Sequence, residues 1–290
     1  MFRDDYKGSY LVPNSDALGS IAANAKLLFR IPPGPTYLFQ QFRFTIAGVA
    51  ATKAQIAAQV AGIRFLVDAV EKFNLTGSQW VDWCELYRGS SVALGVVNHF
   101  WYRPWMEDLR NQDGPAYGMA AADSFTCELT MAGSGITIDK IQLYNSIIDS
   151  EDLGEHVIVV RQSYNFGGTG AFTITDIPKW PGTRMMAMHI APPTGTTSVL
   201  SLVELLADNT RVVYAEPDVI HSRYRLPSSP RTPQTNWRLH LDPTFRNRFI
   251  ESFPMTMQDL RLNLTWATAA PNSFDLVFEL FQPAPQKQAA

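Results

Sequence analysis

The same series of landmarks occurs twice along this chain of 290 residues. In each half, a strand-like segment ends at a Pro/Gly turn, and further strands, a short helix and a strand ending near proline follow. Residues 31–34 and 177–182 form the early turns, and Pro104 and Pro243 end the later strands. Landmarks that recur in one order indicate an internal repeat. The alternative is one large β sandwich with accidental symmetry.

Alternation of apolar and polar residues predicts that most of the chain is β-strand. Nineteen prolines and eighteen glycines interrupt the strands, as in folds built from many short strands and turns. Short helices are expected at 52–60, 79–87 and 217–224. Strands are expected at 25–31, 42–46, 62–69, 91–102, 125–131 and 136–148, and then at 156–166, 172–175, 184–190, 199–206, 211–215, 237–241, 260–266 and 274–280.

About eight strands in each half is the size of one jelly roll, which consists of two packed sheets. We therefore expect an all-β fold of two tandem eight-stranded jelly rolls, with short helices in connecting loops. An acidic turn at 149–154 provides the best boundary between them. Residues 1–150 are expected to hold an N-terminal arm and the first jelly roll. Residues 151–290 are expected to hold the second jelly roll and a C-terminal tail.

Composition restricts the classes of function that remain. The net charge of −3 provides no general attraction to nucleic acid. The two cysteines, Cys84 and Cys127, are too few for a disulfide framework, so synthesis in a reducing cytoplasm is the simplest interpretation. The first residues lack the apolar region of a signal peptide, and no apolar run is long enough to span a bilayer.

No pattern of residues indicates catalysis. The five histidines form no metal-binding pair such as HxH or HExxH, although distant residues could converge in space. The chain has no GxSxG motif, and the glycines at 167–170 lack the lysine of a phosphate-binding loop. We therefore expect no catalytic residues and no cofactor-binding residues.

Acidic residues are densest at the expected domain boundary, at Asp149, Glu151, Asp152 and Glu155. Carboxylates on a turn are suitable ligands for Ca²⁺, so Asp149, Glu151 and Asp152 are candidate metal ligands. The alternative, which the sequence favours, is a solvated linker without a metal ion.

An aromatic stretch follows the expected strand at 91–102. Trp and Tyr are enriched at protein interfaces, so this stretch is a candidate for contact between subunits. The alternative is a local core beneath a long loop. The candidate residues are Trp101, Tyr102, Pro104, Trp105 and Met106.

Four segments, in the expected order across nearly the whole chain, resemble a known family. They are VNHFWYRPWM at 97–106, TCEL at 126–129, ITDIP at 174–178 with GTR at 182–184 and AMHI at 187–190, and QDLRL at 258–262. Each is short, and together they resemble the corticovirus-type major capsid protein, a double jelly-roll protein of tailless, membrane-containing icosahedral bacterial viruses. The aromatic residues around Trp80 and Trp105 depart from that pattern.

The resemblance implies a structural role in the virion capsid after synthesis in the cytoplasm of a bacterial host. It implies homotrimers that form pseudo-hexagonal capsomers, and an icosahedral shell over an internal membrane. The implied partners are copies of the chain itself, a penton protein at the vertices, and the lipid membrane or its minor proteins. Sequence-specific nucleic acid is not among them.

Two other functions remain open from the sequence. The first is a carbohydrate- or receptor-binding β sandwich of a viral spike, in which exposed tryptophans would stack on sugars. The second is a jelly-roll enzyme, which requires titratable groups that converge in a pocket.

Overall fold

The computed structural model describes residues 10–14, 19–86, 94–101, 116–166, 168–192, 199–222, 237–242, 253–268 and 272–282. These residues form two compact units, which divide between Val157 and Ile158. The boundary expected from the acidic turn lies a few residues earlier, at 150 and 151.

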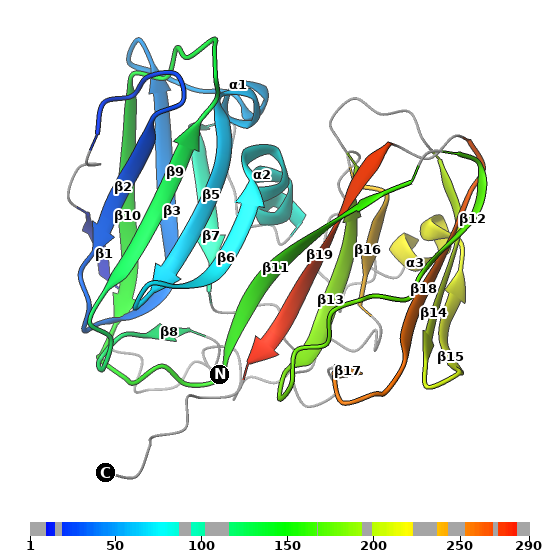
Figure 1. Ribbon diagram of the computed structural model, residues 1–290. Coiled ribbons are helices and arrows are strands. Elements are labelled where there is room, and N and C mark those ends of the chain that lie inside the picture. Colours follow the sequence, from blue (N-terminus) through cyan, green and yellow to red (C-terminus); the bar gives the residue numbers. More distant parts are fainter. Residues whose placement is uncertain are drawn as a thin grey trace. The chain divides into compact units, whose positions relative to one another are not determined.

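The first unit contains two antiparallel sheets (Figure 1). One has the strand order β2-β9-β5-β6, and the other has the order β1-β10-β3, with β4, β7 and β8 also paired to β3. Helices α1 (Lys53–Gln59) and α2 (Gly77–Leu86) precede and follow the β5–β6 hairpin. The strands are β1 (Tyr10–Pro13), β2 (Lys26–Ile31), β3 (Thr36–Ile46), β4 (Val49–Ala50), β5 (Val60–Val67), β6 (Val70–Thr76), β7 (Val96–Phe100), β8 (Tyr117–Gly118), β9 (Phe125–Met131) and β10 (Lys140–Ile148).

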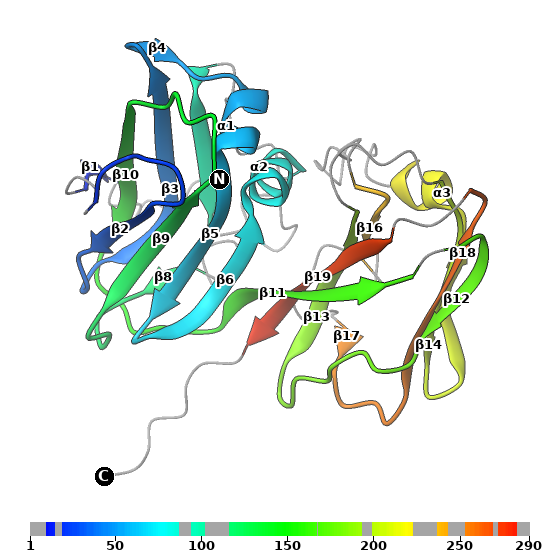
Figure 2. The same ribbon diagram turned by 45° about the horizontal axis from the view of Figure 1, so that its top comes forward.

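The second unit also contains two antiparallel sheets. Their strand orders are β12-β18-β14-β15 and β11-β19-β13-β16, with β17 also paired to β13. Helix α3 (Pro217–Ser222) follows the β14–β15 hairpin (Figure 2). The strands are β11 (His156–Asn165), β12 (Gly170–Ile174), β13 (Arg184–Ala191), β14 (Leu200–Ala207), β15 (Thr210–Ala215), β16 (Leu239–Leu241), β17 (Phe253–Pro254), β18 (Leu260–Trp266) and β19 (Ser273–Gln282).

Strand order is the same in the two units. The sheet β2-β9-β5-β6 corresponds to β12-β18-β14-β15, and the series β1-β10-β3-β7 corresponds to β11-β19-β13-β16. The corresponding hairpins, β5–β6 and β14–β15, are each followed by a helix. The predicted fold of two tandem jelly rolls is therefore confirmed, with β4, β8 and β17 as short additions.

In the first unit, the carboxylate of one turn residue joins the β5–β6 hairpin turn to a segment distant in sequence by hydrogen bonds. Asp68 and Ala69 join β5 to β6 with φ angles of 49° and 62°, in the left-handed region. Oδ1 of Asp68 accepts hydrogen bonds of 2.8 Å from the backbone N–H groups of both Asp123 and Ser124. The turn is therefore held against the residues that lead into β9.

The second unit repeats this arrangement. Asp208 and Asn209 join β14 to β15 with φ angles of 46° and 61°. Oδ1 of Asp208 accepts hydrogen bonds of 2.8 Å from the backbone N–H groups of Gln258 and Asp259, just before β18. The two units thus share the same aspartate-to-backbone hydrogen bonds at corresponding hairpin turns, as well as the same strand order. This supports duplication over accidental symmetry.

Substitution of either aspartate by alanine is expected to lower the free energy of unfolding of its own jelly roll by about 2 kcal/mol. Each change removes two hydrogen bonds to a charged acceptor. It also places alanine, which is poorly suited to a positive φ angle, in the turn. Thermal unfolding of D68A and D208A measures the effect. The controls D68N and D208N keep an acceptor oxygen and tolerate positive φ, so they should lose less. Equal losses in alanine and asparagine variants would contradict this account.

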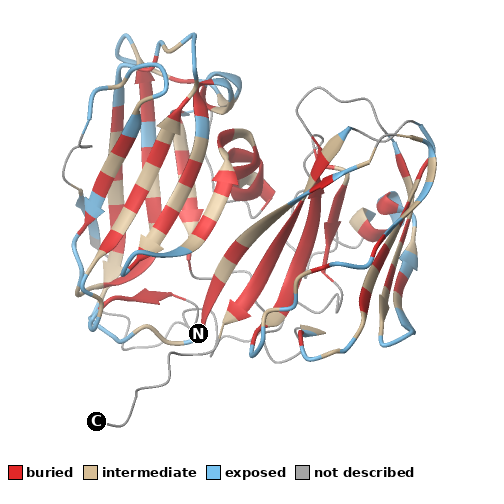
Figure 3. Cartoon of the chain, in the orientation of Figure 1, coloured by how far each residue is buried: buried red, intermediate tan, exposed pale blue. Residues whose placement is uncertain are grey.

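Each unit has its own core between its two sheets. Buried residues alternate with partly exposed residues along β9 and β18, as the sequence pattern predicted (Figure 3). The first core is rich in aromatic rings, including Phe42, Phe65 and Trp80, whereas the second is mainly aliphatic and sulfur-containing. Burial of these side chains is the main stabilising term for each unit.

Some local predictions are confirmed and others are wrong. The helix expected at 52–60 is present as α1, which begins with a capping box in which Thr52 and Gln55 satisfy each other's backbone N–H groups. The strand expected at 91–102 is shorter, because β7 begins at Val96, after Gly95 with a φ of 68°. Strand β6 was not predicted, since Glu71 and Lys72 conceal its alternation.

Candidate functional site

Trp101, the first residue of the candidate interface, lies in the core of the first unit with 3% of its surface exposed. Its ring centroid is 4.2 Å from that of His99 and 4.0 Å from that of Tyr117. Its Nε1–H donates a hydrogen bond of 3.0 Å to Oε1 of Gln40. The expected contact with a neighbouring subunit stays a prediction. The other candidates lie outside the described residues: Tyr102, Pro104, Trp105 and Met106.

The acidic turn is described, and Asp149, Glu151, Asp152 and Glu155 are all exposed. Its backbone is anchored, because the Glu151 N–H donates to Oγ1 of Thr36 at 3.0 Å. Among the described residues, no three acidic, histidine or cysteine side chains are grouped to hold a metal ion. Calcium binding by Asp149, Glu151 and Asp152 stays a prediction.

Gly118 explains how closely this turn packs against the first jelly roll. A β-carbon at Gly118 would lie 2.4 Å from the carbonyl oxygen of Asp152 and 2.5 Å from that of Glu151. Glycine is therefore required at this position in β8, because the backbone of the acidic turn passes directly beside it.

A buried polar network in the second unit was not predicted from the sequence. Nε2 of His189 lies 2.8 Å from Oε1 of Glu279, and the two side chains are 0% and 1% exposed. Nδ1 of His189 lies 3.1 Å from Nδ1 of His240, which is also fully buried. The ring of Trp237 stacks on His240 with centroids 5.0 Å apart.

The network extends from the sheet to helix α3. The backbone N–H of His240 donates a hydrogen bond of 3.0 Å to Nε2 of His221. Register pairs His189 directly with His240 across β13 and β16. The four titratable members of the network come from four separate elements, β13, β16, β19 and α3, which is why short sequence motifs did not reveal them. They are His189, His240, Glu279 and His221. The available signal was one charged or titratable residue within each of two apolar runs, at His189 and Glu279.

Another buried histidine, His156, lies where the chain passes from the first unit to the second. His156 is fully buried, with Nδ1 2.9 Å from the carbonyl oxygen of Gly154 and Nε2 3.2 Å from Nζ of Lys72. The carbonyl can only accept, so Nδ1 carries the proton and Nε2 accepts from Lys72. Burial lowers the pKa of Lys72, and the nearby Asp68 carboxylate opposes that shift.

No helix in the described part of the chain is both long and apolar enough to cross a membrane.

Comparison with protein families gives a match over residues 158–284, to the family described as viral coat protein P2 C-terminal domain. The matched region coincides closely with the second unit, which begins at Ile158. No curated protein gives a significant match.

Solved structures match over nearly the whole chain. The major capsid protein P2 from bacteriophage PM2 is 17% identical and has a TM-score of 0.81, covering 97% of this chain and 100% of that chain. The major capsid protein of Sulfolobus turreted icosahedral virus is 10% identical with a TM-score of 0.69, covering 95% and 97%. The capsid structure of the virus PBCV-1 is 9% identical with a TM-score of 0.64, covering 95% and 94%.

The resemblance inferred from the four short segments is confirmed, since the family match and the PM2 structure point to the same kind of protein. Two of the segments, at 174–190 and 258–262, fall within the matched region. Residues 158–284 therefore match the family viral coat protein P2 C-terminal domain, and the chain as a whole has the double jelly-roll fold of the viral major capsid proteins that it resembles.

Proposed function

We propose that this protein is the major capsid protein of a tailless icosahedral bacterial virus with an internal membrane, and that its role is structural rather than enzymatic. The observation that carries the proposal is the repeated strand order of two jelly rolls in one chain. The coat protein domain at 158–284 supports it independently.

Duplication has a physical consequence for assembly. A trimer of a chain with two similar barrels presents six similar barrels, so a threefold ring fills a nearly hexagonal site. Contacts between different barrels of neighbouring copies are heterologous and close into a ring when the rotation permits. We therefore propose a homotrimeric, pseudo-hexagonal capsomer. The further proposed partners are a penton protein at the vertices and the internal membrane or its minor proteins.

The described tryptophans weigh against a carbohydrate-binding module. Stacking on a sugar requires exposed aromatic rings, whereas five of the seven tryptophans are at most 3% exposed. These five are Trp80, Trp83, Trp101, Trp237 and Trp266. Their surroundings are the interiors of the jelly rolls and the buried histidine network, so they stabilise the fold.

Assembly of the purified full-length chain tests the proposal. Protein concentrated to the millimolar range is expected to form hexagonally tiled sheets or closed shells, which negative-stain electron microscopy detects. The same preparation applied to a glycan array should give no specific binding. A monodisperse protein that never assembles and binds a defined glycan would replace the capsid role with the carbohydrate-binding alternative.

A further inference from the structure

Two amide side chains lie opposite one another in the interior of the first jelly roll. Strand register pairs Gln40 of β3 directly with Asn145 of β10, so the two side chains project from the same face of the sheet. This face is the inner one, because Phe42 and Leu143, two residues away on the same strands, belong to the core. Gln40 is fully buried and Asn145 is 3% exposed. Buried amides of this kind need hydrogen-bond partners for both oxygen and nitrogen.

The orientation of the Gln40 amide is determined by an indole ring. Nε1–H of Trp101 donates a hydrogen bond of 3.0 Å to Oε1 of Gln40. An indole nitrogen can only donate, so the amide atom that faces it must be the oxygen. Nε2 of Gln40 is therefore the donor that still needs an acceptor, and it is buried without a hydrogen-bond partner among the described residues.

The orientation of the Asn145 amide is determined through Asn14, the residue that follows β1. Nδ2 of Asn14 donates a hydrogen bond of 3.2 Å to the backbone carbonyl oxygen of Arg30 in β2, which can only accept. The oxygen of the Asn14 amide therefore faces Asn145, whose Nδ2 donates to it at 3.2 Å. Oδ1 of Asn145 is the atom that remains, and it too is buried without a hydrogen-bond partner in the described part of the chain.

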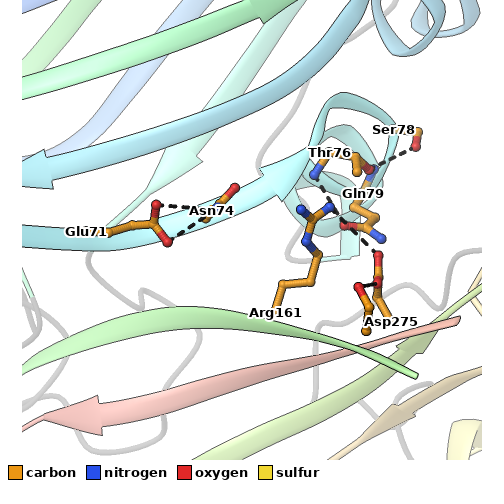
Figure 4. A network of polar contacts seen from close by, with 8 residues as sticks. Glu71, Asn74, Thr76, Ser78, Gln79, Arg161 and Asp275 are labelled. Carbon is orange, nitrogen blue, oxygen red and sulfur yellow. Dashed lines mark hydrogen bonds and ion pairs between the residues drawn. The ribbon is translucent and has the colours of Figure 1, made fainter. Parts of the chain in front are cut away.

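Two other amide side chains of this unit are satisfied by direct contacts. In the buried Gln59, Nε2 donates to Oγ1 of Thr137 at 2.8 Å, and Oε1 accepts the backbone N–H of Ile138 at 2.9 Å. On β6, Nδ2 of Asn74 donates to both carboxylate oxygens of Glu71 at 3.2 Å (Figure 4). An unpaired donor and an unpaired acceptor on opposite residues therefore indicate a bridging group between them.

The chemistry of the two remaining atoms matches that of a water molecule. The hydrogen bonds on either side run in one direction, from Trp101 to Gln40 and from Asn145 through Asn14 to Arg30. Exchanging the oxygen and nitrogen of either buried amide would break one of these bonds. Water accepts and donates at the same time, and buried water occupies sites where polar groups would otherwise be unsatisfied.

We propose that the core of the first jelly roll binds one ordered water molecule, which accepts a hydrogen bond from Nε2 of Gln40 and donates one to Oδ1 of Asn145. The completed series of hydrogen bonds runs from Trp101, at the end of β7, to Asn14, at the end of β1, and on to β2 in the other sheet. The water molecule thus joins the N-terminal strand β1 to the interior. The inference goes beyond the capsid role and does not rest on it.

A high-resolution crystal structure of the full-length chain tests the site directly. The expected result is a solvent peak at hydrogen-bond distance, about 2.7–3.2 Å, from both Nε2 of Gln40 and Oδ1 of Asn145. A direct hydrogen bond between these two atoms would overturn the proposal, and so would a site without solvent density.

Magnetic relaxation dispersion of water oxygen counts long-lived internal water molecules in solution. Q40M and N145L replace each amide by an apolar side chain of similar size, and each should lose one such water molecule relative to the wild type. The double variant should also lose one rather than two, because both residues hold the same molecule. The control Q41M removes an amide from the opposite face of β3 and should keep the wild-type count. Equal counts in the wild type and both single variants would overturn the proposal.

Hydrogen exchange measures the effect of the water molecule on β1. The backbone N–H of Asn14 donates to the carbonyl oxygen of Leu143 at 2.8 Å, so protection of this amide reports the attachment of β1 to β10. Q40M leaves the hydrogen bond between Asn14 and Asn145 in place, yet it should lower this protection about threefold, the effect of losing one bridged hydrogen bond. Q41M should leave it unchanged. Wild-type protection in Q40M would contradict the role of the water molecule in holding β1.

Discussion

Replacing Gly77 by alanine is expected to lower the free energy of unfolding of the first jelly roll by more than about 4 kcal/mol, which is at the upper end for single substitutions. A β-carbon at Gly77 would lie 1.9 Å from the carbonyl oxygen of Val60 and 2.7 Å from its carbonyl carbon. Both are backbone atoms and cannot rotate away. Either β5 or the start of α2 has to move, and each packs against the aromatic core. Thermal and denaturant unfolding of the purified variant measure the loss.

Gly135→Ala is the matched control for Gly77→Ala. Gly135 belongs to the same unit and has a φ of 70°, but a β-carbon there meets no atom within 4 Å. Its cost is only the strain of a positive φ, about 1 kcal/mol. A G77A protein as stable as G135A would show that β5 and α2 are not held as closely as described here.

Replacing Trp80 by alanine is expected to destabilise the first jelly roll by about 3–5 kcal/mol, the usual cost of emptying a buried aromatic site. The ring is fully buried, with centroids 5.1 Å from Phe42 and 6.2 Å from Phe44. Its Nε1–H also donates a hydrogen bond of 3.3 Å to Nδ1 of His99. The substitution therefore removes packing and a buried hydrogen bond together, and calorimetry should show the first jelly roll melting well before the second.

Trp80→Phe separates the two contributions. Phenylalanine keeps most of the ring contacts with Phe42 and Phe44 but has no indole N–H, so its loss should be clearly smaller than that of W80A. If W80A and wild type unfold at the same temperature, α2 does not contribute to the core of the first jelly roll.

Sequence patterns predicted the fold well where burial on one face controls the residue type. The alternation at 125–131 and 260–266 matches β9 and β18, and the helix expected at 52–60 matches α1. The patterns failed where turn geometry decides the ends of elements. Gly95 shortened β7, and the positive-φ turn at Asp68 created a hairpin whose second strand lacks clear alternation.

The buried polar groups could not be assembled from sequence alone. His189 and Glu279 are distant in the chain and meet only because β13 and β19 are neighbours in the second unit's sheet. A histidine or glutamate within an apolar strand indicates a buried partner, but does not name it. The acidic turn shows the opposite situation, because its four carboxylates are adjacent in sequence and yet exposed and ungrouped among the described residues.

Native mass tests the central claim most directly, namely that two tandem jelly rolls in one chain serve to build a threefold ring. Light scattering on the purified protein is expected to give about 97 kDa, three times the 32.4 kDa of one chain. Negative-stain images of the same fraction should show a hexagonal outline. A monodisperse monomer of 32.4 kDa that stays monomeric at high concentration would contradict the claim.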